Sequence, residues 1–493
     1  MTMSNRELCE ATARDLSAAL DAGGTTSADI VSALLERVAL IDERGTDIEL
    51  RSILALAPDA LDAAQRADEE RTNGTLRSRL HGVPILVKDN IEAVGLPGTA
   101  GSTALLGRPV MHDSPLTARI RDAGLIILGA ANLSQWANLR SPHSTSGWSA
   151  VGGLTANPYQ LDRCAGGSSS GSGAALAARL TPLAIGTETD GSITCPASLN
   201  GVVGLKPAVG TLPGEGIVPI SASQDSAGPM ARTVLDTAAL FEILAGIDGV
   251  VERVARGVHD VRIAVASNYM TGHGPTDEIF RSAVQRANDT GIETVNIAVA
   301  EPNEKIGADE LTVMLCEMSD DLTAFLARRG GNGPLTLADV IGFEDVHADV
   351  ELPYFGHEYL VQSLATGGRT GNSYKDARAR NLAWAIDECL AMALADADCF
   401  IAPSYAPAWK NDLVLGGSGN APGSPVTRAP AIAGWPIATV PMGLVEGLPV
   451  GLSIVGRPGS EAVLLAVAHM FETTLSLNES GALVPMFRPA TRG

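Results

Sequence analysis

The chain has 493 residues, and 45% of them are hydrophobic, which is typical of a globular protein with a sizeable buried core. Only 4% are aromatic, so small aliphatic side chains must fill most of that core. The formal net charge of −21 argues against nucleic acid and against an anionic membrane surface as partners, because both require a basic face.

The six cysteines are scattered and never adopt a C-x-x-C spacing, so the sequence predicts neither a zinc site nor a dithiol redox site. Reduced thiols of this kind are typical of a cytoplasmic protein. The first residues lack the apolar run of a signal peptide, and no apolar stretch approaches the roughly 18 residues that a membrane helix requires. We therefore expect a cytoplasmic protein without a membrane partner.

Helical patterns dominate the N-terminal segment, residues 1–70. Apolar residues recur at helical spacing over 30–38, and Thr26 before this run offers the side-chain oxygen of a helix N-cap. Further helical patterns cover 16–20 and 59–73. This segment is expected to be mainly helical.

From Leu80 onward, short apolar runs alternate with helical patterns, as in an α/β sheet with helices on both faces. The candidate strands are 83–87, 125–129, 183–185, 202–205, 261–266, 399–402 and 451–454. Helical patterns also cover 277–289 and 374–395, and no internal repeat or domain linker is visible.

Two Gly/Ser-dense turns, 166–173 and 186–192, are separated by about one helix and one strand. Glycines let backbone N–H groups approach a ligand, and hydroxyls among them are typical of a serine nucleophile with backbone stabilisation of an oxyanion. Two other interpretations stay open at this point. A phosphate-binding P-loop needs a lysine directly after its last glycine, but no lysine follows Gly171 or Gly173. A flexible linker is not usually interleaved with apolar segments such as 183–185.

Three elements, taken in order, resemble the amidase signature family. They are Lys88 directly after the apolar run 83–87, the Gly-Gly-Ser element at 166–172, and the Gly-Thr-Glu-Thr-Asp-Gly-Ser-Ile element at 186–193. The resemblance is strong over about 80–240 and returns at 399–456. It implies an α/β amidase signature fold with a large mixed β-sheet and helices on both faces. It also implies a single amidase domain over 1–493, with the helical segment 1–70 packed on it.

The resemblance implies a Ser-cisSer-Lys triad. Ser192 takes the place of the nucleophile, Ser168 that of a relay serine with a cis peptide bond, and Lys88 that of the base. Only a neutral lysine accepts a proton, so burial is expected to lower the pKa of Lys88 by about three. Ser169 is expected to support this network by hydrogen bonding.

The resemblance places the oxyanion hole on the backbone N–H groups of Thr189, Asp190, Gly191 and Ser192. Asp190 departs from the family pattern, in which glycine is commoner. A carboxylate beside a developing oxyanion would oppose it, so the Asp190 side chain is expected to point toward the substrate channel. The Thr-Asp-Gly-Ser variant resembles the peptide amidase branch.

Several loops resemble that branch and carry side chains suited to an apolar-walled cleft. The substrate-binding candidates are Asp190, Trp148, Tyr354, Phe355 and Trp409. His143 and His357 lie in similar loops and are expected to be exposed, and Cys195 is expected to be a buried small side chain. Ser170 and Gln135 depart from the family pattern, without a role that we can assign.

We therefore expect a serine hydrolase that cleaves carboxamide C–N bonds through an acyl-enzyme, with neither a metal nor an organic cofactor. By resemblance, its substrates are C-terminal amides of peptides or related small amides. The alternative is the ammonia-releasing chain of an amidotransferase (its A subunit), which hydrolyses glutamine for a partner protein, and a catalytically degenerate binding protein is a remote third. We expect a monomer or homodimer. The sequence does not define the exact amide, or whether water or another nucleophile intercepts the acyl-enzyme.

Overall fold

The computed structural model describes residues 3–258, 261–415 and 423–489. Within them, eleven strands form one mixed sheet, which confirms the predicted fold class. In spatial order the strands are β1 (Ile53–Leu56), β3 (Ile126–Ala131), β2 (Pro84–Lys88), β8 (Leu183–Glu188), β10 (Ser226–Ala231), β9 (Val203–Lys206), β14 (Ile437–Val445), β15 (Leu448–Gly456), β13 (Cys399–Pro403), β11 (Ile263–Ala266) and β12 (Thr294–Ile297). Strand β2 is parallel to β3 and β8, and β11 is parallel to β12 and β13, whereas the other pairs are antiparallel.

Every predicted strand is present in this sheet, but its strands β1, β10, β12 and β14 were not predicted. Strand β10 lies at the centre of the sheet and reads Ser-Ala-Gly-Pro-Met-Ala. Proline and glycine argue against a central strand, because proline has no N–H and glycine has no side chain to pack. Here Pro229 pairs with Ile185 of β8, so the surrounding sheet overrides the local preference.

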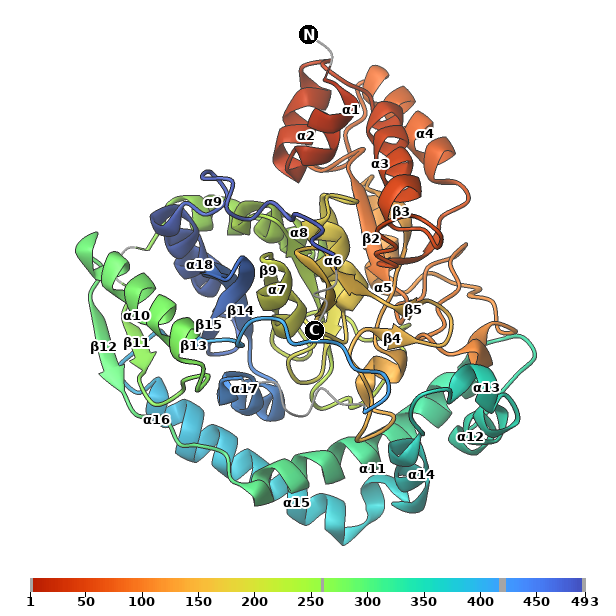
Figure 1. The fold of residues 1–493 in the computed structure, drawn as a ribbon, viewed down its shortest axis with the longest axis vertical. Coiled ribbons are helices and arrows are strands. Elements are labelled where there is room, and N and C mark those ends of the chain that lie inside the picture. The colour runs from red at the N-terminus through yellow and green to blue at the C-terminus, as the bar shows by residue number, and fades with distance from the viewer. Residues whose placement is uncertain (1–2, 259–260, 416–422, 490–493) are drawn as a thin grey trace.

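The N-terminal segment is helical as expected, apart from the edge strand β1. Its helices are α1 (Asn5–Glu10), α2 (Ala13–Asp21), α3 (Ser27–Ile41) and α4 (Ala60–Thr72), drawn in red and orange at the top of Figure 1. Thr26 is the N-cap of α3, and its hydroxyl accepts the Asp29 N–H at 3.0 Å. Asp236 of α8 (Val234–Ala245) accepts the N–H groups of Ala13 and Arg14, so α2 is hydrogen-bonded to a helix that packs on the sheet.

Helices cover both faces of the sheet. Helix α7 (Thr194–Asn200) places Ser198 over Gly451 of β15, and α18 (Glu461–Leu475) places Leu464 over Gly456 of the same strand. The two glycines are five positions apart along β15, so they face opposite sides of the sheet. Helix α6 (Ser170–Ala177) packs beside α7, and α8 packs beside α18.

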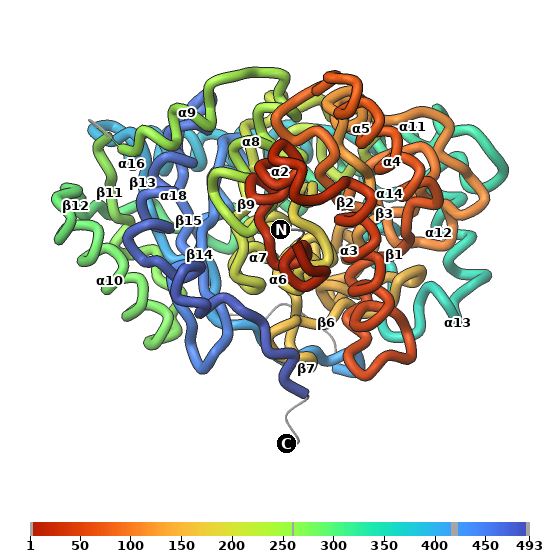
Figure 2. Tube along the Cα trace, turned by 90° about the horizontal axis from the view of Figure 1, so that it is seen from above, coloured from red at the N-terminus to blue at the C-terminus, as the bar shows by residue number. Residues whose placement is uncertain are grey.

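A further helical layer lies along the edge of the molecule opposite α1–α4 (Figure 1). It contains α11 (Glu304–Arg328), α12 (Leu337–Val346), α13 (Ala348–Glu351), α14 (Glu358–Ala365), α15 (Asn372–Leu382), the π-helical stretch η4 (Ala383–Leu390) and α16 (Ala391–Ala393). The helix predicted at 374–395 is therefore divided, and the long helix α11 was not predicted. Figure 2 shows α3 and β1 on one side of the molecule and α10 (Gly274–Asp289) with β12 on the other.

The remaining described elements are short. They are α5 (Pro115–Asp122), α9 (Val250–Ala255), α17 (Arg428–Ala433), η1 (Thr103–Leu105), η2 (Gln135–Asn138), η3 (Gly368–Thr370), η5 (Pro425–Thr427) and the strand pairs β4 (Trp148–Ser149) with β5 (Gly153–Leu154) and β6 (Ala156–Asn157) with β7 (Gln160–Cys164). Among the described helices, none is both long and apolar enough to span a bilayer.

Close packing at the centre of the sheet predicts that Gly228 of β10 cannot be replaced. A Cβ atom there would lie 1.9 Å from the Leu205 carbonyl oxygen of β9. We expect Gly228→Ala to lower the free energy of unfolding by about 3 kcal/mol. Gly214→Ala is the matched control, because a Cβ there meets nothing within 4 Å, and it should change the stability by less than about 1 kcal/mol. Equal midpoints of unfolding in urea for the two variants would contradict this account of the packing.

Candidate active site

Lys88 is the last residue of β2, and its side chain is fully buried. Its Nζ lies 2.8 Å from Ser168 Oγ, 3.0 Å from Ser169 Oγ and 2.8 Å from Thr187 Oγ1. Burial lowers the pKa of Lys88 to about 7, although the carboxylates of Asp225 and Glu188 oppose this shift. Three hydroxyl groups thus surround an amino group whose pKa lies near physiological pH.

Ser168 and Ser169 lie in the loop before α6, and the peptide bond between Gly167 and Ser168 is cis. The Ser169 hydroxyl donates to the Thr187 carbonyl oxygen at 3.0 Å and accepts the Thr187 N–H at 3.2 Å. The Ser169 N–H donates to the Ser192 carbonyl oxygen at 3.1 Å. These bonds join the loop to the end of β8 and to the turn that carries Ser192.

That turn connects β8 to α7, and it folds around the buried carboxylate of Glu188. Glu188 Oε2 accepts the Ile193 N–H at 2.6 Å and the Thr194 N–H at 2.8 Å. Gly191 has a φ of +77°, and a Cβ atom there would lie 2.5 Å from the Tyr405 hydroxyl. Only glycine therefore fits this position.

The same turn presents unused backbone donors beside the Ser192 hydroxyl. Across the described residues, the N–H groups of Asp190, Gly191 and Ser192 donate to no acceptor. Free N–H groups that converge on one side of a turn can bind an anionic oxygen. The geometry is thus compatible with an oxyanion hole in this turn.

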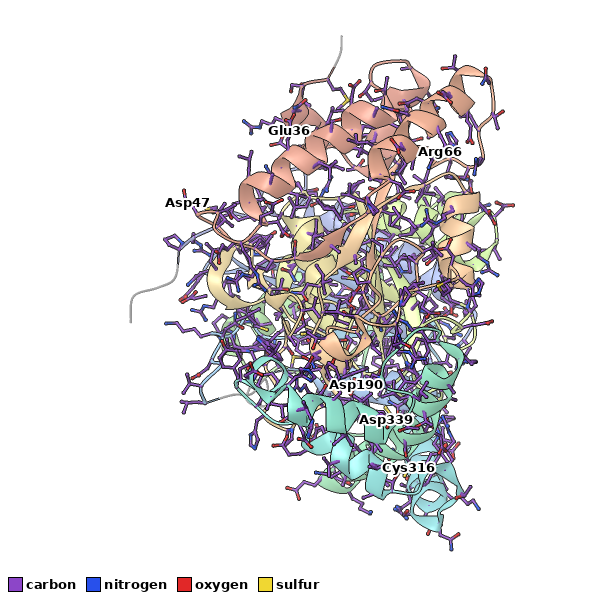
Figure 3. The ribbon with its side chains drawn as sticks, turned by 90° about the vertical axis from the view of Figure 1, so that its right-hand side faces the viewer. Glu36, Asp47, Arg66, Asp190, Cys316 and Asp339 are labelled. Atoms are coloured by element: carbon purple, nitrogen blue, oxygen red, sulfur yellow. The ribbon has the colours of Figure 1, made fainter. Side chains whose placement is uncertain are left out.

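A cavity of about 420 Å³ opens in front of Ser192. Its walls carry the aromatic side chains of Tyr359, Tyr405 and Trp409 and the aliphatic side chains of Ile220, Leu311 and Met314. Its charged residues are Asp190, Glu310 and Arg428. Figure 3 shows Asp190 where the core of the molecule meets the layer that contains α11, far from Glu36 and Arg66. We call this space the substrate cavity.

The charged residues of the substrate cavity form one cluster. Arg428 Nη1 donates to Glu310 Oε2 at 2.6 Å, and Arg428 Nη2 lies 4.0 Å from Asp190 Oδ2. Burial raises the pKa of Glu310, and Arg428 opposes that shift. In the part of the chain that is described, the buried Asp190 Oδ1 has no hydrogen-bond partner. Asp190 and Ser192 thus line the same cavity, and the orientation of the Asp190 side chain toward a substrate stays a prediction.

Three of the aromatic candidates do not line the substrate cavity, which corrects the expectation from the sequence. The Trp148 ring packs edge-on against Tyr354 and Phe355, with ring centroids 5.8 and 5.1 Å apart. The Arg140 guanidinium lies over Trp148, 5.4 Å from the centroid. Trp148 and Phe355 thus pack against the buried Arg140, and Tyr354 packs on Trp148. Trp409 alone of the four aromatic candidates lines the substrate cavity.

The expectation of an exposed loop is correct for His143 and wrong for His357. His357 is buried, and its Nδ1 lies 2.9 Å from Glu344 Oε2, which raises the pKa of this histidine. Gln135 belongs to the same buried network, since its Nε2 donates to Glu351 Oε2 at 2.6 Å. These partners come from α12 and α13, and they explain why neither side chain reaches the substrate cavity.

Cys195 is buried as expected, but it also lines the substrate cavity. Burial raises the pKa of its thiol to about 12, so it is not a nucleophile near neutral pH. Sequence reasoning missed Tyr405, Glu310 and Arg428. Charged residues on a helix normally suggest a solvated face, and no local pattern indicates that Glu310 and Arg428, 118 positions apart, form a buried pair.

Comparison with known proteins agrees with this geometry. The family profile described as Amidase matches residues 29–465, and the chain belongs to the amidase signature family. It is an amide-hydrolysing enzyme of that family. Its structure is similar to that of the native peptide amidase from Stenotrophomonas maltophilia, with a TM-score of 0.88 and 39% identity, covering 94% of this chain and 97% of that chain.

Two curated relatives show how broad this family is. A probable amidase of Arabidopsis thaliana is 34% identical over 484 residues, which cover 94% of this chain and 90% of the relative. The A subunit of the glutamyl-tRNA(Gln) amidotransferase of Halorhodospira halophila is 32% identical over 489 residues, which cover 94% of this chain and 96% of the relative. Both similarities extend over almost the whole chain.

The burial of Lys88 predicts a measurable titration. We expect the Nζ of Lys88 to titrate near pH 7 in a ¹⁵N-lysine NMR experiment. Asp225→Asn should lower this pKa further, because it removes a negative charge that stabilises the ammonium form. Asp321→Asn is the control and should leave the value unchanged. A Lys88 titration near pH 10 in the folded protein would contradict the effect of burial.

Proposed function

We propose that the protein hydrolyses C-terminal amides of peptides, or related small amides, through a Ser192–Ser168–Lys88 triad. The observation that carries this proposal is the 2.8 Å contact between the buried Lys88 amino group and Ser168 Oγ. An isolated serine hydroxyl is a poor nucleophile until a base takes its proton. Lys88 is suited to this task because its pKa is about 7.

The proton path runs from Ser192 to Ser168 and then to Lys88. Ser192 Oγ attacks the amide carbon while Ser168 takes its proton and passes its own proton to the neutral Lys88. The tetrahedral intermediate then collapses, and the same path returns the proton to the leaving nitrogen, which departs as ammonia or an amine. Water attacks the acyl-enzyme along the reverse route and releases the carboxylic acid. Ser169, 3.0 Å from the Lys88 amino group, supports the lysine.

The turn from Thr189 to Ser192 stabilises the oxyanion in this scheme. The unused N–H groups of Asp190, Gly191 and Ser192 support this role. Each such donor is worth about 3 kcal/mol in the transition state. Glu188 holds the turn in place through its bonds to the first residues of α7.

The substrate class follows from the substrate cavity and from the structural similarity to a peptide amidase. Asp190 Oδ1 lacks a partner among the described residues, and an N–H group of a peptide amide is a suitable donor for it. The aromatic and aliphatic walls suit the side chain of the terminal residue. Neither metal nor organic cofactor enters this scheme.

A second candidate is glutamine hydrolysis that supplies ammonia to a partner protein. The similarity to the A subunit of an amidotransferase, over almost the whole chain, favours it. The same triad chemistry serves both functions, so an assay must separate them.

The two candidates predict different substrates for the purified chain. We expect an amidated dipeptide to release ammonia at least a hundred times faster, in kcat/KM, than free glutamine does, without any added protein. The physical reason is that a dipeptide amide fills the apolar walls and bonds to Asp190. Ammonia release is followed for both substrates, with the non-amidated dipeptide as a blank. Glutamine as the better substrate, or activity only with a second protein, would favour the amidotransferase.

Variants of the triad test the proton path. Ser192→Ala and Lys88→Ala should each abolish nearly all turnover, and Ser168→Ala should lower kcat by several orders of magnitude. The double variant Lys88→Ala, Ser168→Ala should be little worse than Lys88→Ala, because residues that act as a unit do not give additive losses. Ser170→Ala is the control, since the Ser170 hydroxyl bonds only to the Gly166 carbonyl oxygen among the described groups, and it should retain activity within a few fold. Additive losses in the double variant would remove Ser168 from the path.

A further inference from the structure

A second cavity, of about 610 Å³, lies next to the substrate cavity. Both cavities are lined by Ala137, Thr189 and Ile220, so they meet at these residues. Ser192 and Asp190 line only the substrate cavity, whereas Asn90, Thr187 and Asp225 line only the second one. The second cavity therefore borders the surroundings of Lys88 rather than those of the Ser192 hydroxyl. We call it the rear cavity.

Asn90 supplies an unsatisfied acceptor in the wall of the rear cavity. The residue is 3% exposed, and its Nδ2 donates to Thr187 Oγ1 at 3.0 Å. Its Oδ1 has no partner among the described residues. A buried amide oxygen without a hydrogen bond costs about 1–3 kcal/mol. Since Asn90 lines the cavity, a donor placed there is the natural partner for this oxygen.

Asp225 adds a carboxylate to the same wall. It accepts the Thr189 hydroxyl at 2.6 Å and the N–H groups of Ile220 and Ser221, but no described cation lies within ion-pair distance of it. At the rim, Asp321 is already paired with Arg369 at 2.5 Å. The rim also carries Glu215 and Arg328, whose opposite charges offset each other. The inner end of the cavity is thus acceptor-rich and negative.

The rest of the wall is apolar. Val209, Leu212, Ile217, Val218 and Ile220 line it. Concave sites that combine apolar walls with a few convergent polar groups are typical ligand sites. At the inner end of the cavity an anion would meet the Asp225 carboxylate, whereas an ammonium group has three donors for Asn90 and Asp225.

We propose that the rear cavity is a second ligand site, which binds a primary ammonium ion with a short apolar chain beside Asn90 and Asp225. The chain lies against the aliphatic wall, and the ammonium group donates to Asn90 Oδ1 and to the Asp225 carboxylate. The occupant is then linked to Lys88 through Asn90 Nδ2 and Thr187 Oγ1, the latter 2.8 Å from Lys88 Nζ. This site is distinct from that of the amide substrate, so both ligands bind at once.

Calorimetric titration of n-hexylammonium into Ser192→Ala protein tests this proposal. We expect one saturable site, with an affinity that an excess of amidated dipeptide leaves unchanged. n-Propylammonium should bind at least tenfold more weakly, because each methylene removed from an apolar wall costs several-fold in affinity. Hexanoate should not bind. The titration of n-hexylammonium alone does not depend on which amide is the substrate. Its result is therefore independent of the test of the proposed function.

Matched variants locate the site. Asp225→Asn should weaken n-hexylammonium at least tenfold, and Asp190→Asn, in the substrate cavity, should not. Ala324→Trp places a large ring on the exposed face of α11 that lines the rear cavity, and it should also weaken binding. Ala327→Trp, at an exposed position of α11 outside that lining, should not. Absence of saturable binding, competition by the dipeptide, or equal effects of the two tryptophan variants would overturn the proposal.

Discussion

The structure around the active site depends on one buried amino group. Lys88 ends β2, which lies between β3 and β8 in the sheet, and removal from water there lowers its pKa to about 7. This position exists because β2 pairs with both β3 and β8, which brings the end of β8 and its Thr187 beside the lysine. Hydroxyl and carbonyl oxygens surround the amino group. Among the described residues, no carboxylate lies within hydrogen-bond distance of it. A lysine on the surface would be charged at neutral pH and unable to accept a proton.

One loop and one turn lie beside this amino group. The loop that carries Ser168 and the turn that carries Ser192 are joined by the Ser169 N–H, and Glu188 organises the turn from inside. Two charged residues from helices also line the substrate cavity. Glu310 comes from α11 and Arg428 from α17, and together they surround Asp190. Lys88 thus lies at the end of β2 and Ser192 in the turn after β8, whereas Glu310 and Arg428 come from helices.

Much of this arrangement could be predicted from the sequence, because its signals are local. The apolar runs marked seven of the eleven strands, and the resemblance to the amidase signature family singled out Lys88, Ser168 and Ser192. Pairings between distant segments left no local signal. Pro229 argued against a strand at β10, and the charges of α11 suggested a solvated face rather than a buried Glu310. Trp148 and Phe355 were predicted to line a cleft, but they pack against Arg140. His357 looked exposed because its partner Glu344 lies on α12, outside its own loop.

In the proposed mechanism, a neutral, buried Lys88 activates Ser192. Inactivation by a sulfonyl fluoride tests it most directly, because the reagent reports the nucleophile and its activation together. We expect mass spectrometry to find the sulfonyl group on Ser192, and the rate constant of inactivation to rise with pH through about 7 as Lys88 loses its proton. Modification of a different serine, or a rate that does not change between pH 6 and pH 8, would contradict the account.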